Sequence, residues 1–430
     1  MEIRKLLNNR ILKNVTLLVS GTAIAQIILM LFQLVLRRLY SPEVFGAFSV
    51  YMSIVGILVI LSTMRYELAV VLPKEDRKAS GLVAGGILIS LTINILVLIV
   101  TIIFKSYIIS WLDFPEKYGY WLYFVPLSTF LFSTYQFFNY WLTRNSAFKA
   151  ISINKVSRRL SEGIVQTIFG AIKSPSGLFA GDIVGNAANI TAGFYQAKRK
   201  GFTFRNLSFR KIRASLRRYS SFPKYQTIPA VLNTTSMLLP VFFINKFYSS
   251  ETAGYFDLSR QMLIVPISFI TASLSQVLLK EFSDRVKNNV KLTPNILRTA
   301  MYLSIGILPF MIVIMIWGEG LFSFFFSETW RMSGNYSAIL APAFAVQFIV
   351  SPLSISFTVL EKLKVLAAWQ ICYFGAVIAL LCLTDLPITY FLAIYTGINI
   401  VAYTTYFLLI INCTRRYDKR TENESQTHIE

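Results

Sequence analysis

A series of about a dozen long apolar segments constrains the fold most, because a helix needs roughly 20 apolar residues to cross a bilayer. Hydrophobic residues make up 55% of the chain and charged residues 15%. A soluble protein of this length could not bury that much apolar surface in its core. Each segment is continuously apolar rather than alternating, which favours helices over a β-barrel. The sequence therefore predicts an all-α membrane protein, with spans near residues 15–36, 44–64, 80–104, 118–142, 159–173, 177–197, 226–246, 254–279, 299–318, 334–359, 364–384 and 387–411.

The net charge of +21 comes from 42 Lys and Arg against 21 Asp and Glu. Most basic residues lie before the first span, in alternate gaps between spans, or after the last span. This is the positive-inside distribution, so we attribute the charge to topology rather than to nucleic-acid binding. The first apolar run is too long for a signal peptide. We expect a bacterial inner-membrane protein with both termini in the cytoplasm.

The longest basic loop, residues 198–224, divides the chain into two halves of six spans. Apolar residues recur there at helical spacing, which predicts a basic amphipathic helix on the anionic cytoplasmic leaflet. It serves either as a linker or as a regulatory or docking element. The expected organisation is an N-terminal six-helix lobe (1–197), this linker (198–224), a C-terminal six-helix lobe (225–411) and a cytoplasmic tail (412–430).

An internal repeat relates the two halves. Residues 39–49 follow the first span and residues 247–257 follow the seventh. Because each half has an even number of spans, the two copies share their orientation. Parallel repeats are a transporter architecture that places substrate between the lobes near the midplane. The identical pairs are Tyr40 and Tyr248, Ser41 and Ser249, Glu43 and Glu251, Gly46 and Gly254, and Phe48 and Phe256.

Four further stretches carry a family likeness: Ser20–Gln26, Arg38–Gly46, Arg65–Pro73 and Gly177–Gly185. With these, the whole chain resembles the polysaccharide-transporter branch of the MOP superfamily, the O-antigen and capsule flippases related to MATE exporters and lipid II flippases. The resemblance implies two six-helix lobes around a central cavity. It also implies translocation of an undecaprenyl-diphosphate-linked oligosaccharide to the outer leaflet. Membrane lipids, a polysaccharide polymerase and its chain-length machinery are the further partners to expect.

A diphosphate requires cations, and an ionisable residue inside a span costs at least about 2.5 kcal/mol. Arg260 is the first candidate, because its guanidinium could hold a diphosphate bidentately. Asp257 lies three residues earlier on the same helical face. The alternatives for this pair are a self-neutralising ion pair or, for Asp257, binding of a coupling ion. Arg37 and Arg38 are candidates at the periplasmic end of the first span, where snorkelling to headgroups explains them equally well.

Two pairs of charged residues lie at predicted cytoplasmic span ends. Arg65 is a candidate for the inward cavity and Glu67 for ion coupling, with interfacial placement as the alternative. Being two residues apart, they should point to different helix faces. Arg158 and Arg159 should begin the fifth span, as positive-inside markers or as a phosphate vestibule.

Uncharged and acidic residues complete the candidate set. Asp182 sits between Gly181 and Gly185, a spacing that lets helices approach closely; it is either an ion-coupling carboxylate or an interfacial one. In the aromatic-rich fourth span, Tyr135 and Asn139 could contact sugars, although interfacial belts also explain such aromatics. Gln26 is a polar candidate for a cavity wall.

Three functions follow from these residues. The leading one is an ion-gradient-driven flippase, since no nucleotide-binding motif is visible. A MATE-like exporter of cationic molecules would need a more acidic cavity. An enzyme is disfavoured because the only histidine is His428 and no catalytic motif appears. Cys372, Cys382 and Cys413 have neither disulfide nor metal-ligand spacing, so we expect no cofactor or metal.

Overall fold

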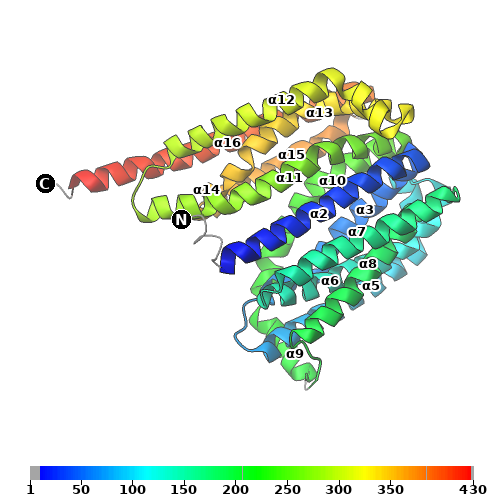
Figure 1. Ribbon diagram of the computed structural model, residues 1–430, viewed down its shortest axis with the longest axis horizontal. Coiled ribbons are helices and arrows are strands. Elements are labelled where there is room, and N and C mark those ends of the chain that lie inside the picture. Colours follow the sequence, from blue (N-terminus) through cyan, green and yellow to red (C-terminus); the bar gives the residue numbers. More distant parts are fainter. Residues whose placement is uncertain (1–9, 206, 384, 428–430) are drawn as a thin grey trace. The chain divides into compact units, whose positions relative to one another are not determined.

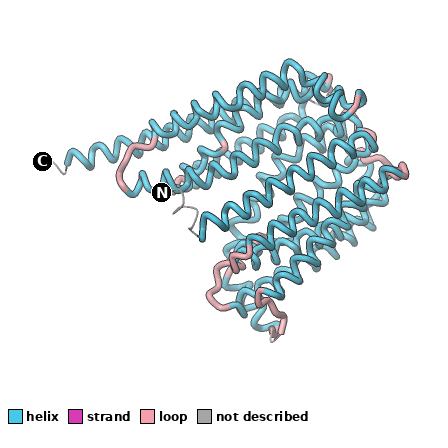
Figure 2. Tube along the Cα trace, viewed as in Figure 1, coloured by secondary structure: helices cyan, strands magenta, loops and turns pink. Residues whose placement is uncertain are grey.

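The computed structural model describes residues 10–205, 207–383 and 385–427, so His428 lies outside the described residues. Every regular element in these ranges is a helix, as Figures 1 and 2 show. The predicted spans correspond to the long helices α2 (Arg10–Leu39), α3 (Pro42–Thr63), α5 (Asp76–Leu112), α6 (Val125–Arg144), α7 (Phe148–Ala171), α8 (Gly177–Arg199), α10 (Ser221–Phe247), α11 (Ser250–Lys287), α12 (Thr293–Phe326), α13 (Arg331–Val350), α15 (Leu363–Ile378) and α16 (Ile388–Thr427).

Among the described helices, eight segments are long and apolar enough to cross a membrane. The all-helical, multi-pass membrane fold is therefore confirmed. The remaining long helices, α6, α7, α8 and α11, are more polar, and they carry most of the candidate site residues.

Contacts divide the chain into two units, Met1–Gly254 and Tyr255–Glu430. This boundary falls after α10, whereas the sequence placed it in the linker at 198–224. The difference arises because α10 packs along α3 and contacts α4 (Tyr66–Ala69) and α5, all in the first unit. The division into two lobes of six spans stays a prediction.

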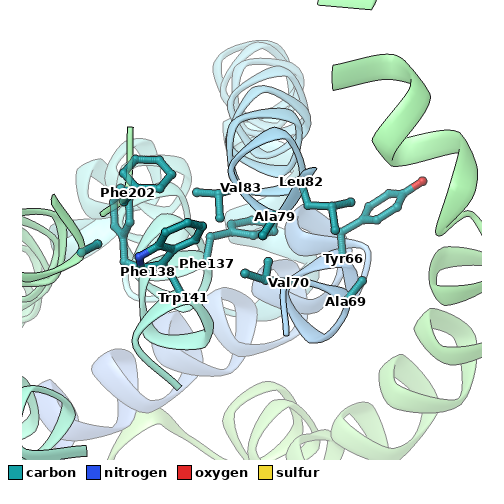
Figure 3. Packing of buried hydrophobic residues seen from close by; sticks show 11 residues of the cluster. Tyr66, Ala69, Val70, Ala79, Leu82, Val83, Phe137, Phe138, Trp141 and Phe202 are labelled. Carbon is teal, nitrogen blue, oxygen red and sulfur yellow. The ribbon is translucent and has the colours of Figure 1, made fainter. Parts of the chain in front are cut away.

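In unit 1, α7 packs extensively against α2 and α8, and α6 packs against α5 and α8 (Figure 1). An aromatic and aliphatic cluster fills one end of this unit (Figure 3). It joins α4, the start of α5, the end of α6 and the loop after α8. Its largest members are fully or almost fully buried: Phe137, Phe138, Trp141 and Phe202.

The two copies of the sequence repeat meet at their shared glycines, within unit 1. A Cβ on Gly46 would lie 1.6 Å from the Ser250 carbonyl oxygen, and one on Gly254 would lie 1.9 Å from the Pro42 carbonyl oxygen. The contact is reciprocal, because each glycine meets backbone from the other copy. Only glycine allows backbones to approach this closely, which explains why both copies carry it.

Unit 2 contains α12 packed on α13, and α13 packed on α16. The α16 helix runs to Thr427, so the described part of the predicted tail, 412–427, is helical. Asp418 in this segment accepts hydrogen bonds from the backbone N–H groups of Leu292 (2.7 Å) and Thr293 (3.0 Å). These groups lie at the start of α12, where N–H donors have no intrahelical partner. The described part of the predicted tail is therefore ordered and caps another helix, while its place in the cytoplasm stays a prediction.

The fifth span also differs from its prediction. α7 begins at Phe148, so Arg158 and Arg159 lie in the middle of a continuous helix rather than at its start. The helix extends further toward its N-terminus than the predicted span because the first half of α7 is too polar to register as a span. Its charges are tolerated because neighbouring helices supply partners.

We predict that Gly46→Ala and Gly254→Ala each destabilise the protein by about 3 kcal/mol, the upper end for overpacking, because the added methyl meets backbone that cannot rotate away. Thermal melting and size-exclusion profiles in detergent measure this. Gly306→Ala and Gly375→Ala are matched controls, because a Cβ at either helical glycine meets nothing within 4 Å. Equal melting temperatures for the two sets of variants would contradict the close backbone contact between the two repeat copies at Gly46 and Gly254.

Candidate functional site

A buried cluster of two arginines and two carboxylates lies between α7 and α8 in unit 1. Arg158 is 3.5 Å from Asp182 and 4.0 Å from Glu162, while Arg159 is 2.9 Å from Glu162. The Asp182 side chain is fully buried and that of Arg158 is 13% exposed. Opposite charges thus neutralise one another inside the helix pair, which is how buried ions are tolerated.

Asp182 is held from three helices. Its Oδ1 accepts a hydrogen bond from Asn186 at 3.0 Å, and its Oδ2 accepts one from the Ser128 hydroxyl of α6. With the Arg158 contact, both carboxylate oxygens are occupied. The flanking Gly181 and Gly185 abut α7 at Glu162, which is the close approach that their spacing predicts.

Next to this cluster lie polar atoms without hydrogen-bond partners. The Tyr135 hydroxyl adjoins Asn154 and Arg158. That hydroxyl, both side-chain polar atoms of Asn154, and Asn139 Oδ1 are buried and make no hydrogen bond. Unsatisfied buried groups of this kind are rare and call for an explanation, such as a ligand or an ordered water.

The three candidates on α2 differ in their burial and in their partners. Arg37 is 1% exposed, stacks on the Phe45 ring at 3.5 Å, and donates to Gln33 at 3.0 Å. It does not snorkel to headgroups as the sequence allowed, because its flat guanidinium fits against the aromatic ring. Arg38 is exposed, and Gln26 is half-buried with an unpartnered Oε1.

Arg65 and Glu67 form an ion pair of 3.4 Å, which corrects the expectation that they point apart. The helix breaks at Met64 and Arg65, whose φ angles are 46° and 60°, so helical spacing does not govern them. Glu67 is buried, and its Oε2 accepts no hydrogen bond. Burial raises the pKa of Glu67, while hydrogen bonding and the Arg65 charge partly oppose the rise.

Unit 2 holds one of the sequence-predicted cations inside a span. Arg260 and Asp257 lie 3.9 Å apart on α11, with 17% and 7% of their side chains exposed. Gln261 donates to Asp257 at 2.9 Å. The Arg260 Nε is buried and makes no hydrogen bond. This guanidinium therefore retains a donor for an anion, and its acidic partner is held at the long end of ion-pair distances.

Residues that the sequence reading did not single out connect Arg260 to an apolar groove. Tyr395 of α16 adjoins Arg260, Asn399 and Tyr373. The Tyr373 hydroxyl donates to Asn399 at 2.9 Å. Tyr373 also lines a groove of about 520 Å³ between α15 and α16, whose other walls include Trp369, Ile398 and Val401. No spacing signal marked this groove, because its members are ordinary span residues.

Within the described ranges, no group of acidic, histidine or cysteine side chains could hold a metal ion. The three cysteines are free.

The model of a family described as polysaccharide biosynthesis proteins matches residues 35–334. The chain belongs to this family. The match to the polysaccharide biosynthesis family includes every candidate site residue except Gln26. No curated protein sequence matches.

Solved structures of the MOP superfamily share the fold. The lipid II flippase MurJ, in an inward-closed conformation, aligns at TM-score 0.75 and 12% identity, covering 94% of this chain and 90% of that one. An inward-facing multidrug-resistance MATE transporter aligns at TM-score 0.72 and 16% identity, covering 94% and 99%. A MOP transporter from Pyrococcus furiosus aligns at TM-score 0.62 and 14% identity, covering 94% and 96%.

We predict that Glu67 makes stability pH-dependent. A carboxyl whose folded pKa is raised contributes stability that is lost as pH rises through that pKa. The thermal midpoint of Glu67→Gln relative to wild type should therefore increase from about pH 5 to about pH 8. Detergent melts at both pH values measure it, with the exposed Glu75→Gln as control. A difference that is constant with pH would contradict the assignment.

Proposed function

We propose that this protein is a flippase that moves an undecaprenyl-diphosphate-linked oligosaccharide, such as an O-antigen or capsule repeat unit, from the cytoplasmic to the periplasmic leaflet by alternating access. Membership of the polysaccharide biosynthesis family supports the oligosaccharide. The observation that carries the proposal is the Arg260 guanidinium, which is largely buried on α11 and has an unpartnered Nε. A diphosphate is the part of this substrate that such a group would bind.

Arg260 fits this role better than the arginines of unit 1. Arg159 is closely paired with Glu162. Arg158 also has a buried Nε without a hydrogen-bond partner, but it faces two carboxylates, Glu162 and Asp182, whereas Arg260 forms an ion pair with one carboxylate, Asp257. Releasing Arg158 would leave a buried carboxylate without its countercharge, which costs about 3–5 kcal/mol. Binding at Arg260 requires only that Asp257, already engaged by Gln261, share its partner.

We propose contacts to the rest of the substrate within each unit separately. The groove between α15 and α16 offers an apolar surface for the polyprenyl chain, and Tyr373 and Tyr395 connect it with Arg260. Tyr135 and Asn139 have unpartnered polar atoms that suit sugar hydroxyls. Gln26, with its buried Oε1, fits the same role, and Arg37, Arg38 and Arg65 would bind or attract the anionic part.

For energy coupling we assign the proton to Glu67. This carboxyl has an unpartnered oxygen and a raised pKa, so it can gain and lose a proton near neutral pH more readily than an ordinary glutamate. Asp182 has both oxygens occupied, and Asp257 is held by Gln261 and Arg260. These two would support the fold of the cavity walls and couple only indirectly.

The decisive experiment complements a deletion strain that lacks a redundant flippase. Wild type should restore surface polysaccharide, whereas Arg260→Ala should leave lipid-linked oligosaccharide on the cytoplasmic side. Arg260→Lys should restore only part of the activity, because a point charge lacks the bidentate fork. Arg285→Ala, on the same helix but in a half-exposed ion pair with Glu281, is the control.

Full rescue by Arg260→Ala would remove this residue from the mechanism. A deletion with unchanged surface polysaccharide and no accumulated intermediate would refute the flippase and favour a MATE-like exporter of small molecules.

We further predict that Gly397→Leu blocks translocation without unfolding the protein. Gly397 lines the α15–α16 groove, and a Cβ there meets nothing within 4 Å, so the new side chain would fill the groove itself. Gly375→Leu is the matched control, since that glycine is equally open but does not line the groove. Rescue of surface polysaccharide, with detergent melts as a folding check, measures the effect. Equal rescue by both variants would exclude the groove.

A further inference from the structure

The basic linker forms a helix that is docked on unit 1. α9 (Phe209–Arg218) packs against the first turns of α5 (Figure 1). A Cβ on Gly85 would lie 2.9 Å from both Ile212 and Leu216, and one on Gly81 would lie 3.0 Å from the Ser215 hydroxyl. The two glycines thus form a notch that receives one face of α9.

Further contacts fix this helix in place. The Tyr66 hydroxyl donates to the Leu216 carbonyl at 3.2 Å. Leu216 and Tyr219 pack on the buried cluster shown in Figure 3, and Ser215 is buried. The sequence placed an amphipathic helix on the leaflet, but its apolar face is occupied by protein. What α9 leaves available is its charged surface and, at its first residue, the exposed Phe209.

A groove of about 480 Å³ opens beside this contact. α9 contributes Lys211 and Arg218, which lie about two turns apart on a single face, and the start of α5 contributes Arg77 and Lys78. The one acidic side chain in its wall is Glu75, which is 2.5 Å from Lys78. Four cations against one carboxylate leave a surplus of positive charge in a concave site. Ala214, Ser215 and Tyr219 complete the wall.

We propose that this groove binds the headgroup phosphate of an anionic glycerophospholipid in the cytoplasmic leaflet. The groove lies at the end of unit 1 that the charge distribution predicts to be cytoplasmic, where anionic lipids attract clustered Lys and Arg. Large apolar side chains lie close to it in the sequence: Phe209, the first residue of α9, is 74% exposed, and Tyr225, near the start of α10, is 76% exposed. Exposed aromatics beside a basic helix suit the headgroup region of a bilayer rather than water.

A lipid explains both features, because its phosphate meets the cations while its glycerol and acyl chains meet the aromatics. A free phosphate would use only the cations. The inference does not depend on the transported substrate, since the groove lies on α5 and α9 and uses none of the proposed transport residues.

The opposite side of α9 provides an internal control. Arg213 and Arg217 are exposed and do not line the groove. The double variants Lys211→Gln with Arg218→Gln, and Arg213→Gln with Arg217→Gln, therefore remove the same charge from the same helix. Only the first pair removes it from the groove.

The test titrates the purified full-length protein in detergent with dioctanoyl phosphatidylglycerol, using native mass spectrometry or thermophoresis. The groove variant should bind roughly 25-fold more weakly than wild type, from two lost cations, and the control variant should be close to wild type. Dioctanoyl phosphatidylcholine should bind weakly to all three proteins. A monodisperse elution profile and an unchanged melting temperature verify that each variant is folded.

Three results would overturn the proposal. Equal losses in the two variants would mean diffuse charge attraction rather than a site. Absence of saturable phosphatidylglycerol binding to wild type would exclude the site directly. Displacement of the lipid by inorganic phosphate at comparable concentration would identify a free-phosphate site instead. A third variant, Ile212→Ala with Leu216→Ala, keeps every charge but loosens the docking of α9; unchanged affinity there would also exclude the groove geometry.

Discussion

The free-energy cost of an unpaired charge inside a bilayer is the constraint on which the rest of this structure depends. A guanidinium or carboxylate in a span persists only if the surrounding helices neutralise it. In unit 1, Arg158, Arg159, Glu162 and Asp182 meet this requirement among themselves, and glycines at 181 and 185 bring α8 close enough for it. The charged side chains of α7 and α8 are thus neutralised by one another. Such a cluster stabilises a packed helix pair. Arg158 keeps a buried Nε without a hydrogen-bond partner, but it faces two carboxylates, so an anionic ligand would have to compete with both.

Charged groups that have an oppositely charged neighbour but also a buried atom without a hydrogen-bond partner are the better functional candidates. Arg260 has a buried Nε without a partner, and Glu67 has a buried oxygen without one. Both are held beside an oppositely charged residue, at 3.9 Å and 3.4 Å, so neither charge is isolated. This intermediate condition allows a ligand anion or a proton to bind without first separating a tight ion pair. It distinguishes these residues from Asp182, although all were similar from sequence.

The sequence was sufficient for the helical membrane fold, because length and continuous hydropathy determine spans directly. It was insufficient where tertiary contacts replace hydropathy. The polar first half of α7 is helical because α2 and α8 cover it, and 412–427 is helical while Asp418 caps α12. The Arg65–Glu67 pair depends on positive φ angles at Met64 and Arg65, which helical periodicity cannot reveal. The groove residues around Tyr373 carry no motif and become a site only through the packing of α15 against α16.

The repeat shows how a shared framework can carry different chemistry. Gly46 and Gly254 are retained in both copies because each crosses the backbone of the other copy. Nearby equivalent positions have diverged: Arg37 stacks on Phe45, whereas its counterpart Asn245 donates to the carbonyls of Leu112 and Asp113 at the end of α5. At the same offset, Arg260 corresponds to Met52 and Asp257 to Ser49. The ion pair of α11 therefore has no equivalent in the first copy. Because the packing of the repeat does not require this pair, the shared architecture does not account for its position on α11, and the ligand-binding role proposed above would account for it.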